Sequence, residues 1–174
     1  MYSLQGLNFR EWIDEHRHLL KPPIGNQQVF ENAEFIIMVV GGPNARKDYH
    51  YNEGEEFFYQ VEGDITLKVM DEDTPRDIVI REGEIFLLPA RVPHSPQRPA
   101  NTVGLVVERK RFDGEMDGFI WFCEQCGERL YEEYFILENI VTQFPPIVNR
   151  FYGSDEHRTC SSCDAVMEPP VQAL

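Results

Sequence analysis

Two histidines and a pair of adjacent glutamates stand within residues 42–98 of this 174-residue chain: His50, Glu55, Glu56 and His94. Two imidazoles and one carboxylate form the ligand set of many non-haem Fe(II) oxygenases, because three protein ligands leave coordination positions open. Neighbouring side chains on a strand point to opposite faces, so only one of the two glutamates can face the histidines. Either histidine alone would be typical of a polar residue near a strand end, whereas the combination indicates a metal site.

Four cysteines form a second candidate metal site. They are arranged as two Cys-x-x-Cys pairs, Cys123 with Cys126 and Cys160 with Cys163. Four thiolates in two such pairs suit a tetrahedral all-sulfur site for Fe or Zn. Disulfides or free thiols are the alternatives, and the lack of a recognisable secretory signal favours a metal. A nucleic-acid-binding ribbon would need basic flanks, so we expect a structural metal site instead.

Two arginines stand at a regular distance from the histidines. Arg46 precedes His50 by four residues, and Arg98 follows His94 by four. In extended segments an even offset directs each arginine to the same side as its histidine. A guanidinium can bind a carboxylate through two parallel hydrogen bonds and keeps its charge, so the pair suggests a ligand that carries a carboxylate. Considered singly, each arginine would more often form a surface salt bridge.

Length and charge favour small-molecule chemistry in a chain of one domain's size. The formal net charge of −14 argues against a phosphate-binding surface, so we expect no nucleic-acid partner. Residues 1–20 lack a basic start followed by an apolar core, and the longest apolar run, residues 35–40, is too short to span a bilayer. We therefore expect a cytoplasmic protein without a membrane partner.

The elements that must position these residues are mostly short strands. Asn8 and Glu11 form a capping pair that predicts a first helix over residues 9–20, stopped by the prolines at 22–23. Turn residues then separate candidate strands at 28–30, 35–40, 56–61, 65–70, 78–80, 85–88 and 103–107. No helix is signalled among them, so the pattern predicts an all-β sandwich or barrel.

The composition changes after Arg111. Residues 137–148 carry apolar side chains at mixed spacing and are interrupted by Pro145 and Pro146, which predicts at most a short helix. We divide the chain into a barrel with its N-terminal helix, residues 1–111, and a C-terminal extension, residues 112–174. The extension carries the four cysteines, and we expect it to pack on the same domain.

The spacing around the three candidate ligands resembles the two sequence motifs of the cupin superfamily. The matches are His50-x5-Glu56-x6-Gly63 and Gly83-x5-Pro89-x4-His94. This resemblance selects Glu56 over Glu55. It implies an all-β dominated fold, a cupin or jelly-roll β-barrel with an N-terminal helix and a small four-cysteine region after it.

Three positions depart from the cupin pattern. Asn52 stands where the first motif has a second histidine, Arg91 replaces a glycine of the second motif, and Arg98 stands where an asparagine is common. Three protein ligands in place of four free a third position on an octahedral metal. A substrate that binds through two atoms, together with dioxygen, needs three positions.

Longer segments carry a closer resemblance, which runs over nearly the whole chain. They are LKPPIGNQQV (20–29), VVGGPNARKDYH (39–50), EEFFYQ (55–60), FLLPARVPHSPQRP (86–99), VVERKR (106–111) and the cysteine pairs. Together they resemble the 3-hydroxyanthranilate 3,4-dioxygenase family. That resemblance implies an extradiol-type cleavage of 3-hydroxyanthranilate by O2. The product, 2-amino-3-carboxymuconate semialdehyde, precedes quinolinate in the kynurenine pathway of tryptophan catabolism and NAD biosynthesis.

The family resemblance also implies roles for individual residues. His50, Glu56 and His94 would hold a catalytic Fe(II), with Glu56 also lining the substrate site. Arg46 and Arg98 would hold the carboxylate of the aromatic substrate.

Further roles implied by the resemblance concern Glu108, Asn26 and the cysteines. Glu108 alone would suggest an exposed carboxylate paired with Arg109 or Arg111, but in this family it would contact the substituents of the substrate ring. Asn26 would lie near the pocket mouth. The cysteines would hold a second, rubredoxin-like Fe, or Zn, and the chain would form a homodimer.

Two other functions remain open from the residues alone. A different cupin enzyme, such as an isomerase or another aromatic dioxygenase, could use the same three ligands, and substrate screening would separate these activities. A non-catalytic cupin that senses a small acid would bind its ligand without oxygen uptake, with the cysteine site as an interaction module.

Overall fold

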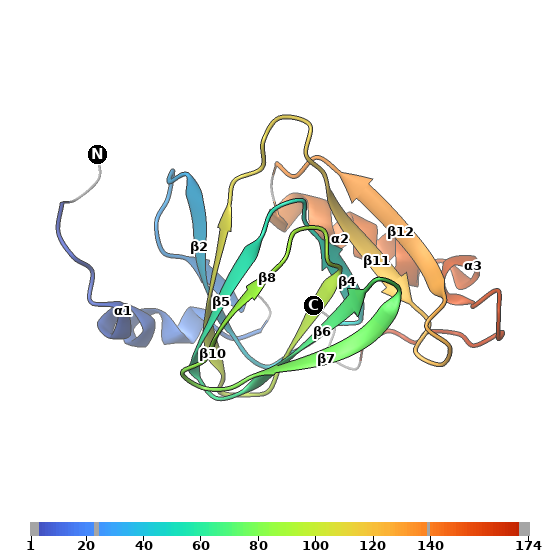
Figure 1. Cartoon of the computed structure of the whole chain (residues 1–174), viewed down its shortest axis with the longest axis horizontal. Helices are drawn as coiled ribbons and strands as arrows, with labels where there is room; N and C mark the ends of the chain where they lie inside the picture. Colours follow the sequence, from blue (N-terminus) through green and yellow to red (C-terminus); the bar gives the residue numbers. More distant parts are fainter. Residues whose placement is uncertain (1–3, 23–24, 139, 171–174) are drawn as a thin grey trace.

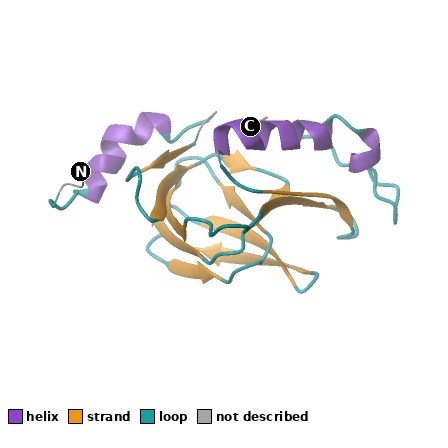
Figure 2. Cartoon of the chain, turned by 90° about the horizontal axis from the view of Figure 1, so that it is seen from above, coloured by secondary structure: helices purple, strands orange, loops and turns teal. Residues whose placement is uncertain are grey.

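The computed structural model describes residues 4–22, 25–138 and 140–170. It consists mostly of β-strands in two antiparallel sheets that pack across an apolar core (Figure 1). The helices α1 and α2 lie along one side of the strands in the view of Figure 2. The expected cupin-like β architecture, with an N-terminal helix and a C-terminal four-cysteine cluster, is confirmed.

The first sheet has five strands in the order β1-β2-β10-β5-β8. The strands are β1 (Asn26–Gln28), β2 (Phe35–Gly41), β10 (Val103–Arg109), β5 (Glu56–Glu62) and β8 (Ile85–Leu88). Side chains on a strand alternate between its two faces. Accordingly, Glu56, Phe58 and Gln60 of β5 share the buried face of the sheet.

The second sheet has seven strands, six of them in the order β12-β11-β4-β9-β6-β7, while β3 pairs with β9. The strands are β12 (Arg129–Phe135), β11 (Asp117–Phe122), β4 (Asp48–Tyr51), β9 (His94–Arg98), β6 (Ile65–Asp71), β7 (Thr74–Ile80) and β3 (Asn44–Ala45). On β9, His94 and Arg98 are both buried. Their separation of four residues places them on the same face.

The apolar core between the sheets draws on both of them. Its buried side chains are Phe58, Leu88 and Val106 from the first sheet and Ile65, Leu67, Val69 and Ile80 from the second. Burying a side chain of this size contributes about 1.5–3 kcal/mol. Glu56 is two residues from Phe58, and Glu108 is two residues from Val106. Each glutamate therefore points to the same side of its strand as the core residue and lies buried beside the core.

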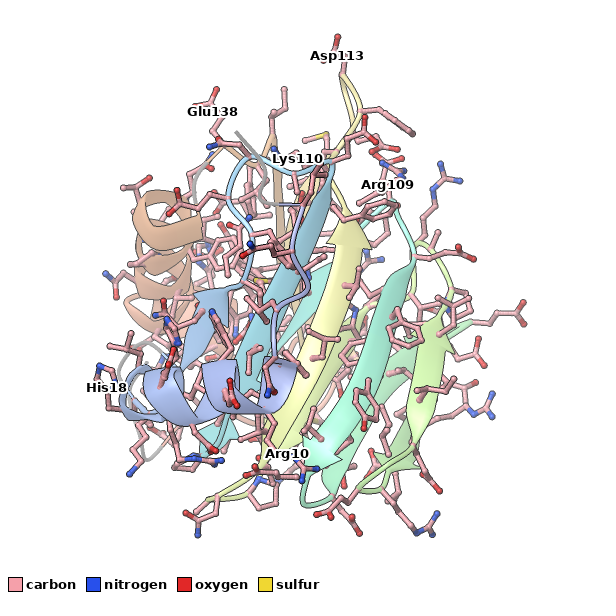
Figure 3. The ribbon with its side chains drawn as sticks, turned by 90° about the vertical axis from the view of Figure 1, so that its left-hand side faces the viewer. Arg10, His18, Arg109, Lys110, Asp113 and Glu138 are labelled. Carbon is pink, nitrogen blue, oxygen red and sulfur yellow. The ribbon has the colours of Figure 1, made fainter. Side chains whose placement is uncertain are left out.

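Helix α1 (Phe9–His16) begins at the predicted cap, where the Glu11 backbone N–H donates to Asn8 Oδ1 at 3.3 Å. A 3-10 turn, η1 (Arg17–Leu19), follows it, so the predicted helix over residues 9–20 is confirmed in outline. Ile13 and Leu20 pack with Val39 and Val103. Figure 3 shows α1 lying across the outer face of the first sheet.

Helix α2 (Ile140–Tyr152) corrects the expectation of at most a short helix, because it continues through Pro145 and Pro146. An interior proline costs an isolated helix about 3 kcal/mol, since it removes an N–H donor and its ring meets the preceding turn. Tertiary packing compensates here. Phe151 stacks on Trp121 of β11 with ring centroids 4.3 Å apart, and Ile147 is buried in the same cluster. A short helix, α3 (Asp155–Arg158), follows.

The sequence patterns did not mark β3, β4, β9, β11 or β12 as strands. Both β4 and β9 are rich in polar residues, and Pro96 interrupts β9, so their apolar periodicity is weak. The division of the chain at residue 111 stays a prediction; β11, which follows it, pairs with β4. Within the described residues, no helix is both long and apolar enough to cross a bilayer.

Candidate functional site

Two cross-strand pairs, one from each sheet, supply the central residues of the site. His50 of β4 lies opposite His94 of β9, and Glu56 of β5 lies opposite Glu108 of β10. Glu56 Oε1 is 3.5 Å from His50 Nδ1, and its Oε2 is 3.3 Å from His94 Nε2. The three candidate ligand atoms all lie within 4.8 Å of one another. The group therefore suits a metal site of two histidines and one carboxylate.

The second ring nitrogen of His50 has a partner that the sequence motifs did not indicate. His50 Nε2 lies 2.7 Å from Oδ1 of Asp117, which is fully buried. Arg111 donates to both oxygens of Asp117, at 2.8 and 2.5 Å. A carboxylate on the outer nitrogen of a ligating histidine orients the ring and makes it a better ligand. This contact therefore leaves Nδ1 of His50 directed toward Glu56.

Burial and hydrogen bonding act in opposite directions on His50. Burial would lower its pKa, but hydrogen bonds with Asp117 and Glu56 outweigh burial and raise the pKa to about 9. Burial likewise would raise the pKa of Asp117, yet the hydrogen bonds from His50 and Arg111 leave that pKa lowered. A cation is favoured at this position, whether it is a proton or a metal ion.

Asn52 joins the two buried glutamates. Its Nδ2 donates to Glu108 Oε2 at 2.8 Å and to Glu56 Oε1 at 3.2 Å, and its Oδ1 accepts the Gly54 N–H at 2.8 Å. Both polar atoms of the buried carboxamide group, Nδ2 and Oδ1, thus form hydrogen bonds. The prediction that Asn52 is not a ligand agrees with this arrangement, in which the amide holds two carboxylates in register.

Glu108 pairs with Arg111, one of the two partners considered from the sequence, at 2.8 Å. Burial raises the pKa of Glu108, as does the nearby Glu56 carboxylate, and Arg111 offsets only part of that rise. Both the Asn52 and the Arg111 hydrogen bonds use Oε2 of Glu108. Oε1 is therefore the oxygen with capacity for another partner.

Arg46 lies between β3 and β4 and already has an anionic partner. Its Nε donates to Asp48 Oδ2 at 2.8 Å, and its guanidinium lies 5.3 Å from the centroid of the Phe119 ring. The same ring is 5.9 Å from that of His50. Arg46 and His50 thus share Phe119 as a neighbour, and the role of Arg46 in holding a substrate carboxylate stays a prediction.

Arg98 differs from Arg46 because, within the described part of the chain, it forms no salt bridge. Arg98 is buried, with 3% of its surface exposed, and burial lowers its pKa to about 10. Its one hydrogen bond runs from NH1 to Gln60 Oε1 at 3.4 Å, and Nε has no partner among the described residues. A buried cation without a counterion is costly, so this geometry favours an anionic ligand.

Two other features contribute less to the site. Asn26 pairs with Val40 in β1, an edge strand of the first sheet, and its expected place at a pocket mouth stays a prediction. An open hollow of about 410 Å³ lies beside Arg98, where Asn44, Gln97 and Pro99 contribute to its lining. None of the three candidate metal ligands lines that hollow, so we do not assign the chemistry to it.

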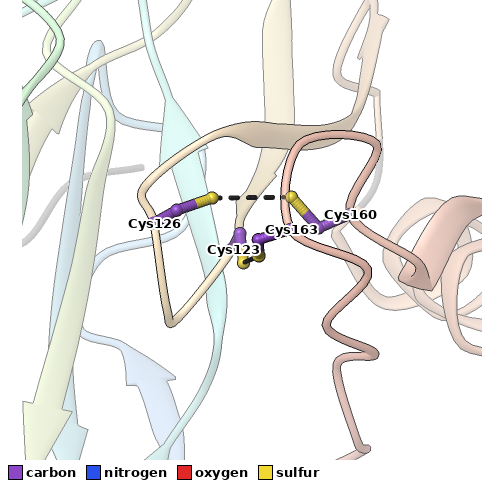
Figure 4. Close-up of side chains that lie close together, drawn as sticks. All are labelled: Cys123, Cys126, Cys160 and Cys163. Carbon is purple, nitrogen blue, oxygen red and sulfur yellow. Dashed lines mark hydrogen bonds between the residues drawn. The ribbon is translucent and has the colours of Figure 1, made fainter.

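The four cysteines meet beside the turn between β11 and β12 (Figure 4). Cys123 and Cys126 lie in the β11–β12 turn, and Cys160 and Cys163 follow α3. Cys123 Sγ is 3.6 Å from Cys163 Sγ, and Cys126 Sγ is 3.5 Å from Cys160 Sγ. Sulfurs bound tetrahedrally at about 2.3 Å from one metal would be about 3.8 Å apart. The cluster therefore fits one metal ion.

The backbone around the cysteines supports that interpretation. The Gly127 N–H donates to Cys123 O, and the Asp164 N–H donates to Cys160 O, both at 2.9 Å, so the two loops form matching turns. Burial would raise the pKa of Cys123, but backbone hydrogen bonds from residues 126 and 125 contribute to lowering it to about 7. At Cys163 a backbone hydrogen bond from residue 165 would lower the pKa, but desolvation and the neighbouring thiols raise that pKa to about 12. Thiolate is the form that binds a metal.

Comparison with known proteins places the chain in a family. The family model described as 3-hydroxyanthranilic acid dioxygenase matches residues 1–152. The chain belongs to this family. A 3-hydroxyanthranilate 3,4-dioxygenase of Xanthomonas euvesicatoria pv. vesicatoria (strain 85-10) is 58% identical over 164 residues, 94% of this chain and 93% of that protein. One of the same name from Jannaschia sp. (strain CCS1) is 52% identical over 174 residues, covering 98% and 97%.

Solved structures offer a more distant comparison. A cupin-2 domain protein from Shewanella frigidimarina NCIMB 400 is 17% identical, with a TM-score of 0.47 over 60% of this chain and 94% of that chain. The resemblance of this chain to 3-hydroxyanthranilic acid dioxygenases, inferred from its motifs, is thus confirmed at the level of the family.

The residues that sequence reasoning missed in this family member support the candidate ligands and the two arginines. Asn52 was considered only as a departure from the cupin motif, and Asp48, Gln60 and Asp117 were not selected for any role. The only sequence signal for Asp117 is a charged residue that opens the apolar run DGFIWF. A motif describes the ligands but not the residues that cross from another strand to hold them.

Proposed function

We propose that the chain is a ring-cleaving dioxygenase that converts 3-hydroxyanthranilate and O2 to 2-amino-3-carboxymuconate semialdehyde. His50, Glu56 and His94 would hold Fe(II). Family membership supports the activity, and the three-ligand geometry supports the metal. When bound, Fe(II) would supply the redox chemistry that lets dioxygen react with an electron-rich ring. The remaining steps concern what the side chains of this chain do for the substrate.

The buried, unneutralised charge of Arg98 is the observation that supports a substrate with a carboxylate group. Its guanidinium is buried, and no described carboxylate neutralises it. The carboxylate of 3-hydroxyanthranilate would fill this need and gain two parallel hydrogen bonds. Arg46 would also bind that carboxylate. Because Asp48 already neutralises part of the charge of Arg46, we expect Arg46 to orient the substrate more than it attracts it electrostatically.

Glu108 would receive a hydrogen bond or a proton from the hydroxyl or amino group of the ring. Its Oε2 is held by Arg111 and Asn52, so Oε1 can turn toward the substrate without breaking either contact. Opposite it, Glu56 is held by the same Asn52. Side chains that are fixed by hydrogen bonds can hold the substrate in the reactive geometry. This orientation raises the rate because less entropy is lost on reaching the transition state.

Dioxygen consumption by anaerobically purified, Fe(II)-loaded protein tests this proposal. We expect stoichiometric O2 uptake when 3-hydroxyanthranilate is added, with the ring-opened product followed by its near-UV absorbance. Glu56→Ala removes a ligand and should abolish uptake. Glu55→Ala is the matched control, because Glu55 precedes Glu56 but is exposed, and it should behave as wild type. Ligand binding without any O2 uptake by the wild-type protein would favour a sensor instead.

The four cysteines would hold a second Fe, or Zn, with a structural role. Their distance in sequence from the other ligands and their position on two turns support a fastening function. Metal analysis of the purified protein should find two metal ions per chain. Removal of the catalytic Fe(II) with a chelator should leave the metal ion of the cysteine site in place.

The outer face of the first sheet supports assembly into a homodimer. On β8, Ile85 is 66% exposed and Leu87 is 53% exposed, and they stand opposite Tyr59 and Phe57 of β5. Figure 3 shows α1 over the neighbouring strands but not over β8. A second copy of the chain would cover these apolar side chains. Light scattering should give twice the mass of one chain, and Leu87→Asp should lower it.

We place this enzyme in the cytoplasm and in the kynurenine pathway.

A further inference from the structure

A second cluster of buried residues repeats the positions of the site four residues along the same strands. Gln60 follows Glu56 on β5, Arg98 follows His94 on β9, and Gly104 precedes Glu108 on β10. An even offset keeps each member on the inward face of its strand. Gln60 and Gly104 are directly opposite each other in the sheet. Arg98 thus lies on the inward face of the barrel, next to Gln60 and Gly104.

The orientation of the Gln60 amide is determined by the backbone. Its Nε2 donates to the carbonyl oxygens of Glu62 at 2.9 Å and Val103 at 3.2 Å. The oxygen, Oε1, therefore faces the NH1 group of Arg98, 3.4 Å away. Gln60 is almost fully buried, with 1% of its surface exposed, so water cannot readily replace these contacts.

Gly104 provides the space in which Gln60 and Arg98 meet. A Cβ atom on residue 104 would lie 2.7 Å from Gln60 Oε1 and 2.8 Å from Arg98 NH1, closer than such contacts allow. The next nearest atom, Tyr59 O, would be at an ordinary 3.5 Å. An alanine here would therefore disturb the ends of two side chains and little else.

We propose that Gln60 is a positioning residue that holds the Arg98 guanidinium for the substrate carboxylate without neutralising its charge. This inference rests on the proposed function and adds a determinant of substrate specificity to it. A neutral amide can orient a guanidinium through one hydrogen bond and leave its charge for another anion. A glutamate of the same size would form an ion pair with Arg98 and compete with the carboxylate of the substrate.

The test compares two substrates in Gln60→Glu and Gly104→Ala. The first substrate is 3-hydroxyanthranilate, and the second is 2-aminophenol, which keeps the hydroxyl and amino groups but lacks the carboxylate. In Gln60→Glu the KM for 3-hydroxyanthranilate should rise about tenfold or more, because a charged hydrogen bond of the substrate is lost. The KM for 2-aminophenol should change by less than about twofold, because that ligand never uses Arg98.

Gly104→Ala provides a second route to the same result. It should shift the KM ratio of the two substrates in the same direction, and its thermal midpoint should stay near wild type, since only two side-chain ends must move. It also decides the matter if Gln60→Glu does not fold. Gln28→Glu, the same chemical change at an exposed position on β1, is the control and should leave both KM values unchanged.

The outcomes separate this inference from the proposed function. A wild-type protein that does not oxidise 3-hydroxyanthranilate would overturn the proposed function and the inference with it. An active wild type with unchanged KM ratios in both variants would overturn the inference alone. A parallel rise in KM for both substrates would also overturn it, because it would show a general structural effect. Anaerobic calorimetry with 3-hydroxyanthranilate should reproduce the KM changes as changes in Kd.

Discussion

The two metal-binding regions of this chain are built in opposite ways. The triad of His50, Glu56 and His94 lies between the two sheets, on strands whose pairing does not depend on a metal. The cysteine cluster joins two turns, and two of its four members, Cys126 and Cys163, are exposed. His50 and Glu56 of the triad are held by other side chains, whereas the two turns bearing the cysteines meet through their sulfurs and through an exposed hydrogen bond from Ser162 Oγ to Glu128 Oε2 at 3.3 Å.

The difference shows how each metal would contribute to the protein. Strand pairing and the apolar core position the triad in advance, so its metal adds chemistry and little folding energy. Met167 and Leu130, beside the cysteines, pack in the apolar cluster of Trp121, but the two loops meet at the sulfurs themselves, so metal binding there would add to the folding free energy. Substitutions in the two regions should therefore affect stability and activity separately.

Glu56→Ala should remove activity below detection and empty the triad while the cysteine metal remains. The reason is that two histidines without the carboxylate bind a divalent metal weakly and leave the charge unbalanced. Metal analysis should fall from two ions per chain to one, and the thermal midpoint should stay close to wild type. A loss of both metals would show that the two regions are coupled.

Cys160→Ser should have the opposite pattern. The cysteine metal should be lost and the free energy of unfolding should fall by more than about 3 kcal/mol, because loss of a structural metal is among the severe kinds of change. Oxygen uptake per folded molecule at low temperature should persist. Ser161→Ala is the control, since residue 161 is exposed. An unchanged denaturation midpoint in Cys160→Ser would contradict the structural role.

Asp117→Asn should weaken metal binding at the triad by about 10–100-fold, because the amide no longer orients the His50 ring as a carboxylate does. Competition with a chelator measures this affinity, and the cysteine metal should be unaffected. Asp113→Asn is a matched control, because Asp113 lies at the exposed tip of the β10–β11 loop (Figure 3). Equal affinities in the two variants would remove Asp117 from the support of the site.

Lys47→Ala should change least. Lys47 Nζ binds Glu124 Oε2 at 2.7 Å and thereby connects the segment before β4 to the first cysteine turn. Glu124 is exposed, so the pair is worth about 0–1 kcal/mol. Urea denaturation should show a small change, with both metals and the activity retained. A larger change in the free energy of unfolding, or a loss of either metal, would mean that this surface contact couples the two regions.

The candidate ligands could be predicted from sequence because their spacing reflects local geometry. His50 and Glu56 are six residues apart on consecutive strands, and each cysteine pair lies within a single turn. Strand patterns likewise predicted β2, β5, β6, β8 and β10 over most of their length and the end of β7, whereas the strand expected at 28–30 shares only Gln28 with β1. They failed for β4 and β9, whose residues are polar because they line the site. Local patterns weaken where function places polar residues inside a barrel.

Residue types at short spacing were sufficient to predict the family, the β-rich class and both sets of candidate metal ligands. The residues that support these ligands could be found only from the folded chain. Asp117 reaches His50 from β11, and Gln60 reaches Arg98 from the facing sheet. Such contacts depend on strand order and register, which arise when the whole barrel closes. The unpaired charge of Arg98 is a property of the same kind, because burial and the absence of a described counterion can be judged only after every neighbour is in place.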